Sequence, residues 1–285
     1  MKKALFIITL LFFAQIAFAQ SAISVEKTGN GKPIIFLPGF TTPGSVWNET
    51  VKHLNGKFES YKVTYAGFNG IQPVDTPWYA ALKRDLSKYI IDENLSNITL
   101  VGHSMGGNLA IDIAAEFPGR VTGLVLVESI PCMRELMMPG VPASSLQYNS
   151  PYNNSLLKMP EENFKTMAAG MAKMMTNVPA KAEEITNWSV IADRQTYVYG
   201  YTDLLKLDLR ETLTKIDIPT LILGASFPDK EMIKTNYIKQ YANLKNKVLI
   251  IFDDSKHFIM FDQPEQLYSQ LNKYLEKNVK GQKAF

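Results

Sequence analysis

The sequence predicts an α/β fold, in which helices flank a mostly parallel central sheet and a helical segment is inserted between two parts of the chain that form the sheet. Two observations predict it. Short apolar runs rich in β-branched residues alternate with helix-like segments, and one long stretch of the second half has no strand pattern. Alternation of strands and helices requires crossover connections, which are typical of parallel sheets.

Six runs are predicted to be buried strands. Continuous apolar runs, as opposed to alternating ones, are typical of strands that are covered on both faces. The runs span residues 34–37, 61–65, 98–101, 124–127, 220–223 and 248–252. Helix-like periodicity lies between them, over residues 46–54, 78–93, 108–117, 231–241 and 264–278. The last of these helices begins with proline, which suits a first helical turn.

The first 19 residues are predicted to be a secretory signal peptide. Two lysines precede an apolar run over residues 4–18, and Ala17-Phe18-Ala19 then places small residues two apart, as a signal peptidase site requires. A membrane anchor is the weaker interpretation, because the run is shorter than the roughly 20 residues that cross a bilayer. Cleavage after Ala19 would export the protein to the periplasm or the medium, without a membrane partner.

Charge and cysteine content exclude several classes of function. Removal of residues 1–19 leaves 266 residues with 28 basic and 27 acidic side chains, a formal charge of +1. Such a chain has no electrostatic attraction to nucleic acid or to an anionic membrane. The one cysteine, Cys132, cannot form an internal disulfide. It is expected to be a small buried side chain that takes no part in catalysis.

Residues 131–206 are expected to form an inserted, mainly helical cap. They separate two parts of an α/β core, at residues 20–130 and 207–285. No strand pattern occurs in this segment, and proline and asparagine interrupt its first part. The sequence does not indicate an oligomeric state.

Eight of the twelve methionines lie in the predicted cap. Met167, Met171, Met174 and Met175 have a spacing that places them on one helix face. Two interpretations remain open. The side chains could form the core of the cap, or Met167, Met171 and Met174 could line a substrate pocket in which flexible thioethers adapt to the ligand.

Gly102-His103-Ser104-Met105-Gly106 is the most specific chemical signal. This G-x-S-x-G motif follows a predicted strand and precedes a predicted helix, which is the context of a nucleophile elbow. The turn is so tight that the positions two before and two after the serine cannot carry bulky side chains, while the serine takes a strained backbone conformation. The hydroxyl then lies at a helix N-terminus, whose amides favour negative charge. Ser104 is therefore predicted to be a nucleophile.

A serine nucleophile needs a general base, and the chain has three histidines. His103 is adjacent to Ser104, but the turn is expected to direct it away, as a packing residue. His53 lies in an amphipathic helix and is expected at the surface. His257 follows the last predicted strand, from where a loop can bring its imidazole to Ser104. It is predicted to be the base.

Three segments resemble the α/β-hydrolase superfamily, in its capped, esterase-like branch. They are the elbow, Leu37-Pro38-Gly39-Phe40 and Lys256-His257-Phe258. The resemblance covers residues 23–277 and implies the α/β-hydrolase fold. It also implies an oxyanion hole made by the backbone N–H groups of Phe40 and Met105. The family usually has histidine where Pro38 stands, but a backbone donor is compatible with this difference.

The resemblance also implies an acid that orients the histidine, and two positions are open. In most of the family an aspartate lies three residues past the glycine that ends the strand before the last. That position is Phe227 here, and Asp229 lies two residues further on. Some branches place the acid after the strand that follows the elbow helix, which is Glu128 here. Asp229 suits the N-cap of the following helix, whereas an unpaired glutamate at a buried strand end would be costly. Glu128 is therefore favoured, with Asp229 as the alternative.

The predicted reaction is acyl transfer to water on carboxylic esters of small or medium acyl and alkyl groups, through an acyl-enzyme. No nucleotide motif or histidine cluster is present, so no cofactor and no metal are expected. Two other functions stay open. One is an exported aminopeptidase that would bind a substrate ammonium through acidic cap residues such as Glu161, Glu162, Glu183 and Glu184. The other is a binding protein that kept the fold without turnover.

Overall fold

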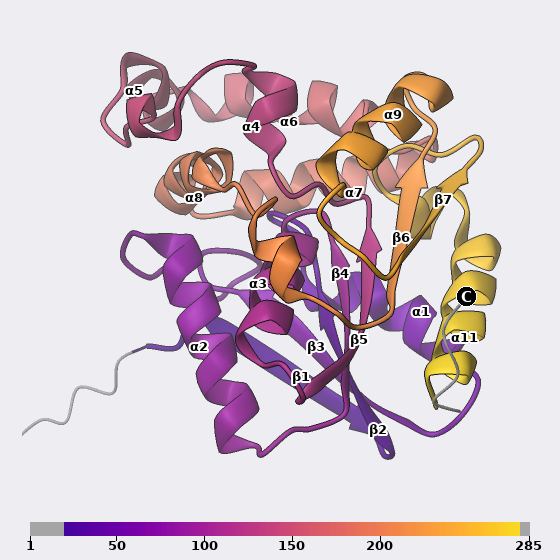
Figure 1. Ribbon diagram of the computed structural model, residues 1–285. Coiled ribbons are helices and arrows are strands. Elements are labelled where there is room, and N and C mark those ends of the chain that lie inside the picture. Colours follow the sequence, from indigo (N-terminus) through magenta and orange to yellow (C-terminus); the bar gives the residue numbers. More distant parts are fainter. Residues whose placement is uncertain (1–19, 280–285) are drawn as a thin grey trace, which may run out of the picture.

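The computed structural model describes residues 20–279, which form one seven-stranded sheet with helices on both faces and further helices over one end (Figure 1). The predicted signal peptide and the bond after Ala19 lie outside or at the edge of the described residues. Within residues 20–279 no helix is both long enough and apolar enough to cross a membrane.

The strand order in the sheet is β1-β3-β2-β4-β5-β6-β7. All neighbours are parallel except β1 and β3. The six predicted strands are present, each extended by one to three residues. The strands are β1 (Ile23–Gly29), β2 (Lys32–Leu37), β3 (Phe58–Tyr65), β4 (Ile98–His103), β5 (Val121–Val127), β6 (Thr220–Ala225) and β7 (Lys247–Phe252).

The strand β1 is absent from the sequence-based prediction. It is an edge strand that pairs only with β3, and most of its side chains are exposed. An exposed edge strand needs no apolar run, so a search for such runs does not find it.

Side chains of successive residues in the central strands are buried on opposite faces of the sheet. In β2, Ile35 and Leu37 belong to one apolar cluster, and Ile34 and Phe36 belong to the other. The first cluster includes side chains of α2 (Trp78–Asp92), α3 (Met105–Glu116) and α9 (Lys230–Gln240). The second includes residues of α11 (Pro264–Val279) and of the short 3₁₀ helix Gly44–Trp47, which leads into α1 (Asn48–Lys52). Burial on both faces explains the continuous apolar runs.

Between β5 and β6 the chain forms helices, and none of these described residues is in a strand. The α-helices are α4 (Met133–Met137), α5 (Pro151–Leu157), α6 (Glu161–Lys173), α7 (Pro179–Ile191) and α8 (Arg194–Lys206). Figure 1 shows them as a layer over one end of the sheet. Cys132, at the start of this segment, is a buried free thiol as expected.

Candidate active site

Ser104 is the single residue between β4, which ends at His103, and α3, which begins at Met105. Its φ and ψ are 53° and −122°, in the left-handed half of the backbone map that a non-glycine residue occupies only under strain. A Cβ on Gly102 would lie 2.4 Å from the Gly106 carbonyl oxygen, and a Cβ on Gly106 would lie 2.2 Å from that of Leu37. The predicted crowding of the elbow is therefore confirmed.

His257 lies in the loop after β7, and its side chain lines the same two cavities as Ser104. The imidazole Nδ1 is 3.3 Å from Glu128 Oε2. A carboxylate can only accept, so Nδ1 carries a proton, and in the neutral imidazole the lone pair is then on Nε2. Among the described residues no hydrogen bond joins Ser104 to His257, although both line one cavity, and catalytic hydrogen bonds often tighten only in the complex with substrate.

Glu128 directly follows β5 and has a positive φ of 46°. Its Oε1 accepts from the Ala225 N–H at 2.6 Å and from the Tyr237 hydroxyl at 3.0 Å. Burial and the nearby Glu128 carboxylate raise the pKa of Tyr237 well above its usual value, so the phenol stays a donor. One oxygen of the carboxylate is thus held by the protein, and the other faces His257.

Asp229 is the N-cap residue of α9, where its Oδ1 accepts from the Met232 N–H at 2.8 Å. The residue is exposed and lines neither cavity that contains Ser104. Its position matches the capping role that the sequence suggested.

Of the two residues predicted to form the oxyanion hole, Phe40 lines a cavity together with Ser104, and Met105 directly follows the serine. Within residues 20–279 neither backbone N–H donates to another protein group. Gly39 lies against the serine, since a Cβ on it would be 3.4 Å from that of Ser104. The Phe40 ring packs against Trp78 and Phe68, with centroid separations of 5.7 and 5.0 Å. Both N–H groups are therefore free to donate to a ligand oxygen.

Asp262 organises the loop that carries His257, a role that the sequence did not indicate. Its Oδ2 accepts from the Lys256 N–H at 2.8 Å, and its Oδ1 accepts from the Thr176 hydroxyl at 2.6 Å and the Asn177 N–H at 2.8 Å. One carboxylate thus connects the histidine loop to the turn between α6 and α7.

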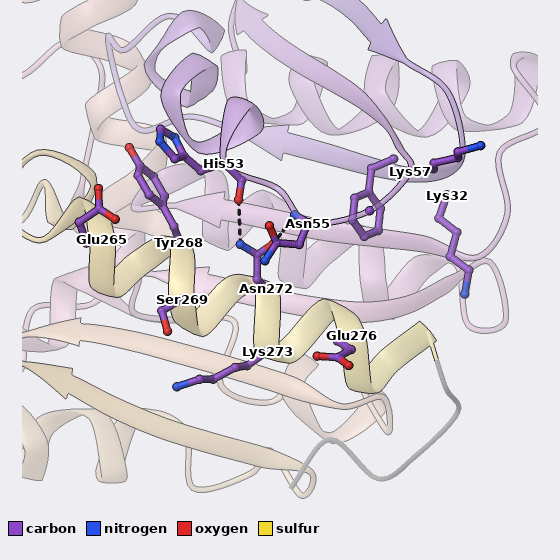
Figure 2. Close-up of a pocket in the computed structure, with 12 residues that line it drawn as sticks. Lys32, His53, Asn55, Lys57, Glu265, Tyr268, Ser269, Asn272, Lys273 and Glu276 are labelled. Atoms are coloured by element: carbon purple, nitrogen blue, oxygen red, sulfur yellow. Dashed lines mark hydrogen bonds between the residues drawn. The ribbon is translucent and has the colours of Figure 1, made fainter.

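The other two histidines have different surroundings. His53 is exposed and stacks on Tyr268. Together with Asn272 it lines a separate pocket, and neither Ser104 nor His257 lines that pocket (Figure 2). His103 is fully buried, and its Nε2–H donates to the His257 carbonyl oxygen at 2.9 Å. His103 therefore does more than pack beside the turn, because it joins the elbow to the His257 loop. The sequence carried no signal for this contact.

Burial of His103 is expected to make the folded protein less stable in acid. Burial, and then the nearby His257, lower the pKa of His103 well below 6.5. Below pH 6.5 the unfolded chain binds a proton that the folded chain does not, so stability falls as the pH falls. Between pH 7.5 and 5.5 the free energy of unfolding should drop about 1.4 kcal/mol more in the wild type than in His103→Gln, as measured by urea denaturation. An equal drop in both proteins would contradict this assignment.

The larger of the two cavities that contain Ser104 is about 230 Å³ and mainly apolar. Met171 and Met175 line it, together with residues of α7 and α8. Met167 lines a neighbouring cavity, whereas Met174 is 56% exposed and lines neither. The expected position of Met174 is wrong: this residue caps the end of α6, where the helix tightens and the Met174 N–H donates to the Met171 carbonyl oxygen three residues back.

The four glutamates considered for an ammonium site do not line the two cavities that contain Ser104. Glu161, Glu162 and Glu183 are exposed, and Glu184 pairs with Lys181 at 2.5 Å. Among residues 20–279, Glu128 is the one acidic side chain that lines either cavity, and it is engaged with His257. Across residues 20–279, no group of three or more His, Cys, Asp or Glu side chains is placed to hold a metal ion.

Comparison with known proteins places this geometry in context. The sequence model of the "Alpha/beta hydrolase family" matches residues 34–270. A pimeloyl-[acyl-carrier protein] methyl ester esterase of Legionella pneumophila is 24% identical over 261 residues, which cover 89% of this chain and 99% of that protein. A non-heme chloroperoxidase of Kitasatospora aureofaciens is 27% identical, with 83% and 89% covered. The structure of an esterase from Exiguobacterium antarcticum superimposes with a TM-score of 0.74 at 22% identity, covering 89% and 95% of the two chains.

Proposed function

The chain belongs to the alpha/beta hydrolase family, and we propose that it acts as a serine hydrolase of carboxylic esters with small or medium acyl and alkyl groups. The observation that carries the proposal is the contact of Glu128 with His257, in a cavity that also contains the strained Ser104. The esterase relative and the esterase structure support ester bonds as the target. The predicted signal peptide supports export before the enzyme acts.

The proposed mechanism uses the free Nε2 of His257 as the base. The Ser104 hydroxyl attacks the ester carbonyl carbon and gives its proton to Nε2, and the carbonyl π electrons move to the oxygen. The Phe40 and Met105 N–H groups stabilise this oxyanion, and Glu128 stabilises the imidazolium. Collapse breaks the bond to the alcohol, which takes the proton from His257. Water then repeats the sequence on the acyl-enzyme, releasing the acid and Ser104.

Two features of the cavities favour an ester over a peptide amino terminus. Their lining is mainly apolar, and the carboxylate that faces them, Glu128, is engaged by His257, Ala225 and Tyr237. We regard the helices between β5 and β6 as a cap, since Met133, Met171 and Tyr201 of that segment close the cavity above Ser104.

A small substrate panel tests the proposal. The wild-type protein should hydrolyse p-nitrophenyl acetate and butyrate and leave amino-acid p-nitroanilides intact, because the cavity offers no free acid to an ammonium group. Release of p-nitrophenol or p-nitroaniline is measured by absorbance. Turnover of the anilides alone would replace the ester function with that of an aminopeptidase, and no turnover and no fluorophosphonate labelling would indicate a binding protein.

A further inference from the structure

A second cavity of about 480 Å³ lies among the helices of the cap. It is formed by α4, α5, α6, α8 and the loop before α5, and it contains none of the residues of the proposed mechanism. Its apolar lining includes Met137, Leu146, Leu156, Met167, Val198 and Leu205.

The second cavity and the larger of the cavities that contain Ser104 share a wall made of side chains. Met171, Tyr197 and Tyr201 line both of them. The Tyr201 hydroxyl donates to Met137 Sδ at 3.4 Å, so this part of the wall is held by a weak contact. Met171 is an unbranched thioether that changes rotamer easily. The wall is thus a side chain thick, and part of it is adaptable.

The polar groups of the second cavity are mostly bonded to one another. The Asn153 amide donates to the carbonyl oxygens of Gln147 and Tyr148 and lies 3.0 Å from the Thr202 hydroxyl. The thioether of Met137 and the phenol of Tyr152 also line the cavity, and these residues are 56% and 68% exposed. The cavity therefore suits a ligand without polar groups.

The volumes of the cavities indicate which part of a substrate each could hold. Small-molecule sites in proteins commonly span about 300–1,000 Å³. The two cavities that contain Ser104 each fall below this range, at about 180 and 230 Å³, whereas the second cavity lies within it. An ester chain that is too long for the larger cavity at Ser104 has a further apolar space on the other side of Met171.

We propose that the second cavity binds the unbranched apolar chain of an ester whose carbonyl lies at Ser104, with the chain passing beside Met171. The proposal rests on the proposed ester hydrolysis and names its substrate class as esters with an unbranched alkyl chain of medium length. Each methylene that enters the second cavity raises kcat/KM about fourfold, because it leaves water for an apolar surface.

The test blocks the second cavity and leaves the Ser104 cavity open. Met167 lines the second cavity only, so Met167→Trp fills it from α6. Met174→Trp is the matched control, since Met174 follows the same helix and faces solvent. Both variants and the wild type are assayed with p-nitrophenyl butyrate, octanoate and decanoate. We expect Met167→Trp to lower kcat/KM for decanoate at least tenfold and to leave butyrate unchanged, while Met174→Trp changes neither.

Two series of esters show whether the alkyl chain in the second cavity belongs to the acyl group or to the alcohol. A rise of kcat/KM with acyl length places the chain on the acyl side, and a rise only along a series of alkyl acetates places it on the alcohol side. No rise in either series, or an equal loss on all esters in Met167→Trp, would overturn the proposal. Leu146→Trp fills the cavity from the opposite wall and gives the same test should Met167→Trp fail to fold.

Binding without turnover separates this proposal from the proposed function. Titration calorimetry of Ser104→Ala with decanoate should show binding that Met167→Trp in the same background removes. Decanoate binding without ester hydrolysis by the wild type would end the esterase function and keep the subsite. Hydrolysis of p-nitrophenyl butyrate without decanoate binding and without chain-length dependence would keep the esterase function and end the subsite.

Discussion

Replacing Ser104 with alanine is expected to lower kcat for p-nitrophenyl butyrate about a millionfold, as loss of the nucleophile does in serine hydrolases of similar design. The effect is large because His257 and the Phe40 and Met105 amides act on a proton and an oxyanion that form only when this hydroxyl attacks. The fold should be unaffected, since alanine differs by one oxygen atom at a position where both residues have the same backbone strain. Stopped-flow or steady-state release of p-nitrophenol measures the loss.

Ser189→Ala is the matched control for this result. Ser189 lines the same cavity from α7, but its hydroxyl donates to the Ile185 carbonyl oxygen of its own helix at 3.2 Å. A fluorophosphonate should label the wild type and Ser189→Ala and fail to label Ser104→Ala. Labelling of Ser104→Ala, or undiminished hydrolysis by it, would remove Ser104 from the mechanism.

The parts of this site that the sequence predicted are those set by local rules. The elbow needs glycine at fixed distances from Ser104, so its motif is visible in five residues, and the structure has the predicted crowding. His257 could be placed near Ser104 because the ends of parallel strands meet at one edge of the sheet. The central strands were predictable for a similar reason, since burial on both faces leaves a continuous apolar run.

The parts that the sequence left open depend on packing between distant segments. The bond from His103 to the His257 carbonyl and the bonds of Asp262 to the cap join residues from 85 to 154 positions apart. The sequence favoured Glu128 over Asp229 through helix capping and burial, but it kept both open because each follows a strand that ends at the same edge. Their difference lies in which carboxylate reaches the imidazole, and this depends on Tyr237 and Ala225, which hold Glu128 in place.

Replacing Glu128 with glutamine should lower kcat about ten-thousandfold, with little effect on folding. Glutamine keeps an oxygen for the Ala225 N–H and the Tyr237 hydroxyl, so the local contacts can persist. It then presents an NH₂ group to His257 Nδ1 where the wild type presents an acceptor. The amide favours the tautomer with the proton on Nε2, which cannot accept the proton of Ser104, and it does not stabilise the imidazolium. Ester hydrolysis and thermal unfolding of the variant measure the two effects.

Asp229→Ala tests the other acid in the same assays. Loss of its bond to the Met232 N–H removes an N-cap and should lower the free energy of unfolding by about 1 kcal/mol, with kcat unchanged. The opposite ranking, with a large loss of kcat in Asp229→Ala and a small one in Glu128→Gln, would require the loop after β6 to rearrange and carry Asp229 to His257. Because that aspartate caps α9 at the surface, such a movement would also break the start of the helix, so the two variants distinguish a fixed glutamate from a mobile aspartate.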